Sequence, residues 1–94
     1  MPADFTSLRN HYEQPVLNTV IGLATSHPDL DRELLPDVAC VALNRLPARY
    51  IRHQADLAFY LTEQERQDSD RLVHEAVSHA FEFVKARVAA RARS

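Results

Sequence analysis

Apolar residues recur at helical spacing through the first quarter of the chain. Between residues 6 and 25 they fall every three or four positions, at Leu8, Tyr12, Val16, Val20 and Leu23. This spacing places them on one face of a helix. Pro15 falls inside the pattern, and a proline lacks the N–H that an inner helical turn uses. The sequence therefore predicts a kink or a break at Pro15.

A second helix is predicted over residues 36–46, PDVACVALNRL. Pro36 suits the first helical turn, where its missing N–H costs nothing. The segment is apolar on nearly every side up to Asn44, so this helix is expected to be central. It should end before Pro47, because the residue that precedes a proline disfavours the helical conformation.

The longest apolar stripe lies in the last third of the chain, at Leu72, Val73, Ala76, Val77, Ala80, Phe81, Val84 and Val88. Thr62 and Glu65 have the spacing of a capping box at its start. A helix over residues 62–91 would be about 45 Å long, at about 1.5 Å per residue. That length exceeds the diameter of so small a domain, so its end should fray or pack on a second chain. In such a dimer, replacing Val77 or Val84 with aspartate is expected to weaken the assembly.

The segments between these helices show no clear helical periodicity. Residues 26–34 read as a loop that runs into a short helical turn. Tyr50 and Ile51 suit the start of an extended segment, and residues 55–61, ADLAFYL, fit either a strand or an irregular connection. A single glycine and the lack of internal repeats argue against a β-rich fold. The sequence predicts a mainly α fold, a small single domain over residues 1–94 with a long C-terminal amphipathic helix, forming a homodimer.

Composition narrows the class of protein. The chain has 94 residues, of which 46% are hydrophobic and 26% are charged, which is typical of a globular domain and not of a disordered one. No apolar run approaches the roughly 20 residues of a membrane helix, and the N-terminus lacks a signal pattern. A soluble, cytoplasmic protein without membrane contact is expected. The net charge of −2 counts against duplex DNA as a partner.

Little in the sequence indicates catalysis or a metal. The one cysteine, Cys40, lies in an apolar helix, where a thiol behaves as a small hydrophobic residue. His74 and His79 are five positions apart, whereas helical metal-binding pairs usually lie four apart. We therefore expect no enzymatic activity, no catalytic residue, no cofactor and no tightly bound metal. Elemental analysis of protein purified without chelator tests the last expectation.

The helix stop at residues 43–51, LNRLPARYI, carries an unusual set of side chains. Arg45 and Arg49, followed by Arg52, offer forked donors to phosphate or to the acceptors of guanine. A tyrosine ring stacks on bases, and an asparagine amide reads a base edge. A structural alternative remains open: Asn44 caps the helix, Tyr50 fills the core and the arginines are solvated.

The segments RNHYEQPV and DVACVALNRLPARYI together resemble the late competence development protein ComFB family. The first part of the family pattern is matched by Asn10, Glu13 and Val16. The second part is matched by Asp37, Val38, Ala42, Leu43, Asn44, Leu46, Pro47, Arg49 and Tyr50. Several family members carry a zinc-binding cysteine cluster before the Asp-Val position. This chain has the acidic segment HPDLDRELLPDV there instead, and Ala48 replaces a second proline.

The resemblance implies a small, mainly helical homodimer that acts as a cytoplasmic receptor for cyclic dinucleotides. The ligand would be cyclic di-GMP or, in some members, cyclic di-AMP, and the signal would pass to a partner protein that the sequence does not identify. The ligand-binding residues that we predict are Asn10, Glu13, Asn44, Arg45, Arg49 and Tyr50. The alternative function is a structural helical homodimer or adaptor, in a competence- or motility-related pathway, with no nucleotide ligand.

Overall fold

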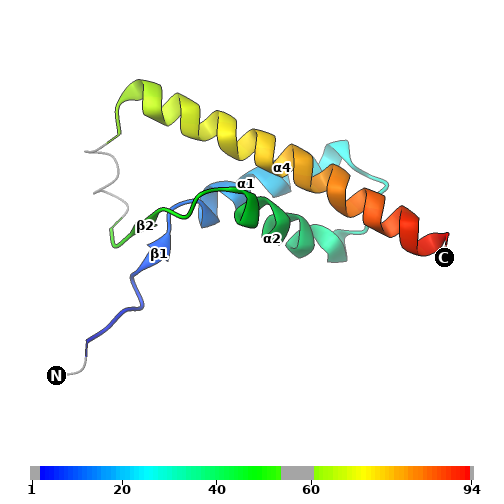
Figure 1. Ribbon diagram of the computed structural model, residues 1–94, viewed down its shortest axis with the longest axis horizontal. Coiled ribbons are helices and arrows are strands. Elements are labelled where there is room, and N and C mark those ends of the chain that lie inside the picture. Colours follow the sequence, from blue (N-terminus) through cyan, green and yellow to red (C-terminus); the bar gives the residue numbers. More distant parts are fainter. Residues whose placement is uncertain (1–2, 54–60, 94) are drawn as a thin grey trace.

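A long helix crosses the molecule and two shorter helices pack against its middle (Figure 1). The computed structural model describes residues 3–53 and 61–93. Its elements are β1 (Arg9–Asn10), α1 (Glu13–Leu23), the 3₁₀ turns η1 (Ala24–Ser26) and η2 (Arg32–Leu34), α2 (Leu35–Arg45), β2 (Tyr50–Ile51) and α4 (Glu63–Ala92). The predicted mainly α fold is confirmed. The predicted segment 55–61 lies outside the described residues, except for Leu61.

Helix α1 begins later than the apolar spacing predicts. Residues Arg9–Asn10 form a strand, and the Oδ1 of Asn10 accepts a hydrogen bond from the N–H of Tyr12, at 3.2 Å, just before the first helical residue. Pro15 consequently lies in the first turn of Glu13–Leu23, where an N–H would have no helical acceptor. The predicted break at Pro15 is wrong for this reason. Leu8, which the spacing assigned to the helix, is 52% exposed.

Helix α2 is central, but only one of its faces is covered. Val38, Ala39 and Ala42 are buried. Cys40 is exposed, so its predicted place as a small core residue is wrong. As predicted, the helix ends ahead of Pro47: Leu46 is extended, with ψ of 144°, and its side chain is buried in the core.

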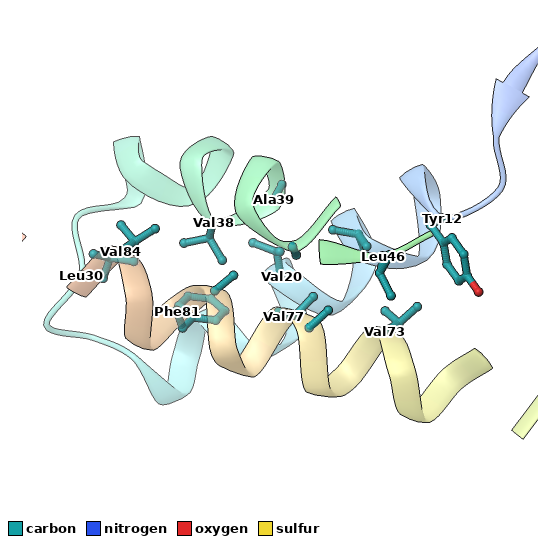
Figure 2. Packing of buried hydrophobic residues seen from close by; sticks show 14 residues of the cluster. Tyr12, Val20, Leu30, Val38, Ala39, Leu46, Val73, Val77, Phe81 and Val84 are labelled. Atoms are coloured by element: carbon teal, nitrogen blue, oxygen red, sulfur yellow. The ribbon is translucent and has the colours of Figure 1, made fainter. Parts of the chain in front are cut away.

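Helix α4 follows the capping signature that the sequence contains. The Thr62 Oγ1 accepts a hydrogen bond from the N–H of Glu65 at 3.1 Å. The buried face of the helix extends from Val73 to Val84 and packs against α1 and α2 (Figure 2). Leu72 and Val88 are each 41% exposed, so the apolar stripe continues beyond the core at both ends.

The segment between α1 and α2 is fastened to α4 at the end of the molecule away from the strands (Figure 1). The ring of His27 stacks on Phe81, with 4.1 Å between centroids and an interplanar angle of 4°. Lys85 forms an ion pair with Asp29 at 3.3 Å and lies 3.2 Å from Nδ1 of His27. Because an ammonium group only donates, that nitrogen is the acceptor in this contact. A ring stack and a charge pair thus hold this acidic segment on the core.

Within residues 3–53 and 61–93, no helix combines the length and apolar character needed to cross a membrane. In the same part of the chain, no group of three or more histidine, cysteine, aspartate and glutamate side chains is arranged to hold a metal ion. The expected absence of a tightly bound metal stays a prediction.

Candidate functional site

A short antiparallel ribbon joins the two segments that carry the sequence motifs. Strand β1 pairs with β2, with Arg9 opposite Ile51 and Asn10 opposite Tyr50. The N–H of His11 extends the pairing by donating to the carbonyl oxygen of Arg49 at 2.6 Å. The ribbon lies beyond the packed ends of α1 and α2, on the side from which the N-terminal segment extends (Figure 1). Residues far apart in the sequence therefore share one small surface.

Asn10 holds this surface in shape. Its Oδ1 accepts the backbone N–H of Arg49 at 3.0 Å, across 39 positions of sequence, as well as that of Tyr12. The same oxygen therefore ties the start of α1 to the turn that follows α2. An aspartate offers oxygen acceptors at this position too, but it would lack the donor amide of Asn10. We assign to Asn10 the positioning of Arg49.

The exposed side chains of the ribbon and its flanks are arginines and one tyrosine. Tyr50 is 66% exposed, so the alternative that its ring fills the core is wrong. The side chains of Arg9, Arg49 and Arg52 are exposed as well. Arg9 was not among the predicted site residues. In the sequence, only its position immediately before Asn10 connects Arg9 to the predicted site. In the structure, the strand pairing places Arg9 opposite Ile51.

A cavity of about 210 Å³ lies between the ribbon and the start of α4. Its walls include His11, Tyr12 and Arg49 on one side and Glu65, Asp68 and Ser69 on the other. Basic, acidic and hydroxyl groups thus converge on one small concave space. The residues from α4 were not predicted as site residues, because nothing in their local spacing distinguishes them from the first turns of an ordinary exposed helix.

His11 is the most unusual group of this cavity. Its Nδ1 is buried and has no hydrogen-bond partner within the described residues. Partial burial, and secondly the nearby Arg49 guanidinium, lower the pKa of His11 below its ordinary value of 6.5, while Asp70 opposes the shift. The imidazole is therefore held neutral. Buried polar atoms in folded proteins normally have a partner, so this nitrogen is an exception.

Acidification is expected to destabilise the protein through His11. The unfolded chain, with an ordinary histidine pKa, binds a proton more readily than the native state does. The free energy of unfolding should therefore fall as the pH drops through and below about 6.5, until the lowered native pKa is passed. Urea unfolding at about pH 7.5 and about pH 5.5 measures the change, one unit on either side of the ordinary histidine value.

Two variants make that measurement specific. In His11→Gln the loss of stability between the two pH values should be smaller than in the parent protein. His74→Gln, at an exposed position of α4, should leave the loss unchanged. An equal loss of stability in all three proteins would show that His11 does not carry the effect.

The other predicted residues lie apart from the ribbon contacts. The Nδ2 of Asn44 donates to the thiol of Cys40 at 3.6 Å, within α2. The Arg45 guanidinium lies 3.4 Å from Nε2 of His79 on α4. Glu13 is exposed in the first turn of α1, where a carboxylate complements the helix dipole. The structure thus unites Asn10 with Arg49 and Tyr50, and gives Asn44 and Arg45 other partners.

A second cavity, of about 320 Å³, lies between α2 and the C-terminal half of α4. Asp37, Cys40 and Val41 line it from α2, and Arg87 and Val88 line it from α4. It is larger than the cavity beside the ribbon, but among these residues only Asp37 belongs to the motif positions. The ribbon cavity, by contrast, is lined by the motif residue Arg49 and by His11, which follows Asn10.

Comparison with known proteins gives one result. A family model described as late competence development protein ComFB matches residues 9–88. The match begins at β1 and ends near the C-terminus of α4, so it includes β1, α1, α2, β2 and most of α4. No curated protein and no solved structure matches the chain.

Proposed function

The chain belongs to the late competence development protein ComFB family, and we propose that it is a cytoplasmic receptor without enzymatic activity. Its ligand is a cyclic dinucleotide, cyclic di-GMP or cyclic di-AMP, and binding is relayed to a partner protein. The observation that carries the proposal is the pairing of β1 with β2. This pairing brings Arg49, which lines the concave pocket, onto the same short ribbon as exposed Arg9 and Tyr50.

The chemistry of these groups suits such a ligand. A cyclic dinucleotide has two phosphates and two purines. Guanidinium groups bind phosphate through forked hydrogen bonds, and the exposed ring of Tyr50 offers a surface on which a base stacks. Pro47 and the Asn10 hydrogen bond to Arg49 fix the turn before the ligand arrives, which lowers the entropy lost on binding.

We also propose that the receptor is a homodimer, because a two-fold assembly supplies matching groups to both halves of a two-fold ligand. Helix α4 carries partly exposed apolar side chains outside the core, of which Leu72, Phe83 and Val88 are between 41% and 42% exposed. Val77 and Val84 are unsuitable for testing this interface. They are 0% and 6% exposed, in the protomer's own core, so aspartate there would unfold the chain.

Phe83→Asp is expected to weaken the dimer while the protomer stays folded, because its side chain is already 42% exposed in the single chain. Light scattering at about tens of micromolar, a working concentration chosen because assembly depends on mass action, measures the mass. Circular dichroism checks the helix content of the variant. A parent protein that is monomeric under these conditions would contradict the proposed dimer.

A thermal-shift screen with cyclic di-GMP, cyclic di-AMP, GMP and duplex DNA tests the receptor function. A ligand at 100 times its dissociation constant stabilises the native state by about 2.7 kcal/mol. For a domain of this size that corresponds to a rise of roughly 10 °C or more in the melting temperature. The melting temperature should rise by this amount with a cyclic dinucleotide and should not rise with DNA. No rise with either cyclic dinucleotide would favour a purely structural dimer or adaptor.

A further inference from the structure

We propose that the cavity between the β1–β2 ribbon and the start of α4 is a pocket for a guanine base, read by the carboxylates of Glu65 and Asp68. This inference rests on the proposed receptor function and deepens it. It names the base that the receptor prefers, cyclic di-GMP over cyclic di-AMP, and it assigns recognition to residues on α4 that lie outside the motif.

The size of the cavity limits what enters it. At about 210 Å³ it is smaller than the roughly 300 Å³ at which pockets for drug-sized ligands begin. A whole cyclic dinucleotide does not fit. A single flat base is the part of the ligand that fits, and the remainder stays on the exposed surface of the ribbon.

The polar groups of the cavity match guanine. The N1–H and the amino group at C2 of guanine are adjacent donors, and a carboxylate accepts both. Adenine presents an unprotonated N1 at the corresponding position, so a carboxylate there meets an acceptor. O6 and N7 of guanine are acceptors that an arginine such as Arg49 can contact. A cavity with Glu65 and Asp68 on one wall and Arg49 on the other therefore selects guanine.

The Glu65 carboxylate is available for this contact. In a complete capping box the glutamate returns a hydrogen bond to the N–H of the capping residue. Here Thr62 accepts the N–H of Glu65, but the Glu65 side chain makes no hydrogen bond or ion pair within the described residues. Asp68 uses Oδ1 for Gln64 and Arg71, at 3.0 and 3.4 Å, and its Oδ2 makes no such contact with the described residues.

His11 adds a polar ring to the wall of the cavity. Its Nδ1 is buried and has no partner within the described chain, so a base in the cavity would meet the accessible part of the ring and not this nitrogen.

The distribution of charge orients the ligand. The start of α4 carries Glu65, Asp68 and Asp70, which repel phosphate, whereas the ribbon carries Arg9 and Arg49, which attract it. A ligand with its base toward α4 and its phosphates along the ribbon satisfies both sets of charges. A ligand placed the other way would set phosphate against carboxylates.

Calorimetric titration of the full chain with cyclic di-GMP and with cyclic di-AMP tests the inference. The parent protein should bind cyclic di-GMP about ten- to a hundred-fold more tightly, the effect of a hydrogen bond to a charged group. Glu65→Gln and Asp68→Asn should each weaken the binding of cyclic di-GMP. Each should also reduce the ratio of its affinity to that of cyclic di-AMP. Glu63→Gln, at an exposed neighbouring position of the same helix, should change neither affinity.

The outcomes separate the pocket from the receptor function. Equal binding of the two ligands by the parent protein overturns the guanine pocket and leaves the receptor standing. An unchanged preference for cyclic di-GMP in both Glu65→Gln and Asp68→Asn also overturns the guanine pocket and leaves the receptor function standing. Binding of neither ligand overturns both proposals.

Discussion

Replacing Phe81 with alanine is expected to lower the free energy of unfolding by about 3–5 kcal/mol. Phe81 is fully buried, at 0% exposed, and is among the largest fully buried side chains of the core. Its ring packs among the side chains of α1, α2 and α4 (Figure 2). It also stacks on the ring of His27. A chain of 94 residues has a total stability of roughly 5–14 kcal/mol. The variant should therefore lose a large share of its stability, and urea titration monitored by circular dichroism should show a much lower unfolding midpoint.

Phe5→Ala is the matched control. The chemical change is the same, but Phe5 is 72% exposed and precedes the ribbon. Its effect should stay within about 0.5 kcal/mol, as for most surface substitutions. Comparable losses for Phe5→Ala and Phe81→Ala would contradict the description of the core.

Replacing Arg49 with alanine is expected to weaken cyclic dinucleotide binding roughly ten- to a hundred-fold. A charge-assisted hydrogen bond contributes about 1.5–3 kcal/mol, and each 1.4 kcal/mol is a factor of ten. The fold should survive, because the pairing of Arg49 with His11 and Asn10 uses only its backbone. Its guanidinium makes no hydrogen bond or ion pair within the described residues. Tyr50→Ala should remove stacking of similar size, about 1–3 kcal/mol.

Arg32→Ala provides the comparison. Arg32 is an exposed arginine in η2, at the end of the molecule away from the ribbon (Figure 1). Its loss changes the net charge by the same amount and should leave affinity unchanged at moderate ionic strength. If Arg49→Ala binds as the parent protein does, or if Arg32→Ala loses as much affinity, the ribbon is not the phosphate contact.

Much of the helical framework follows from local chemistry. The spacing of Thr62 and Glu65 predicts the start of α4. The observed hydrogen bond from the N–H of Glu65 to Thr62 is the one that this spacing predicts. Pro47 forces Leu46 out of the helical conformation, so the end of α2 is readable as well. These features depend on residues a few positions apart, which is the range over which sequence patterns are informative.

The errors arose where a distant contact decided the local structure. Apolar spacing alone extended the first helix back to residue 6. The side chain of Asn10 instead bonds both Tyr12 and Arg49, which makes a strand and a turn before Glu13. Cys40 was interpreted as a small hydrophobic residue of an apolar helix, yet it lies one turn from Asp37 and Asn44 on an exposed face of α2.

The candidate site was readable only in part for the same reason. The motif identified Arg49 and Tyr50, which the ribbon exposes together. No spacing rule connects them to Glu65 and Asp68. The start of α4 lies near the ribbon only because the helices pack around a common core. Arg45 was predicted as a site residue from its place at the helix stop, but its guanidinium lies beside His79 instead.

The measurement that tests the central claim most directly is a titration of the isotope-labelled protein with cyclic di-GMP, followed by amide chemical shifts. Binding at the ribbon cavity should produce saturable amide shifts concentrated at Arg9–Asn10, at Tyr50–Ile51 and at Glu65, Asp68 and Ser69. Shifts concentrated at Asp37, Cys40 and Val88, around the larger cavity, would contradict it, as would the absence of any saturable shift.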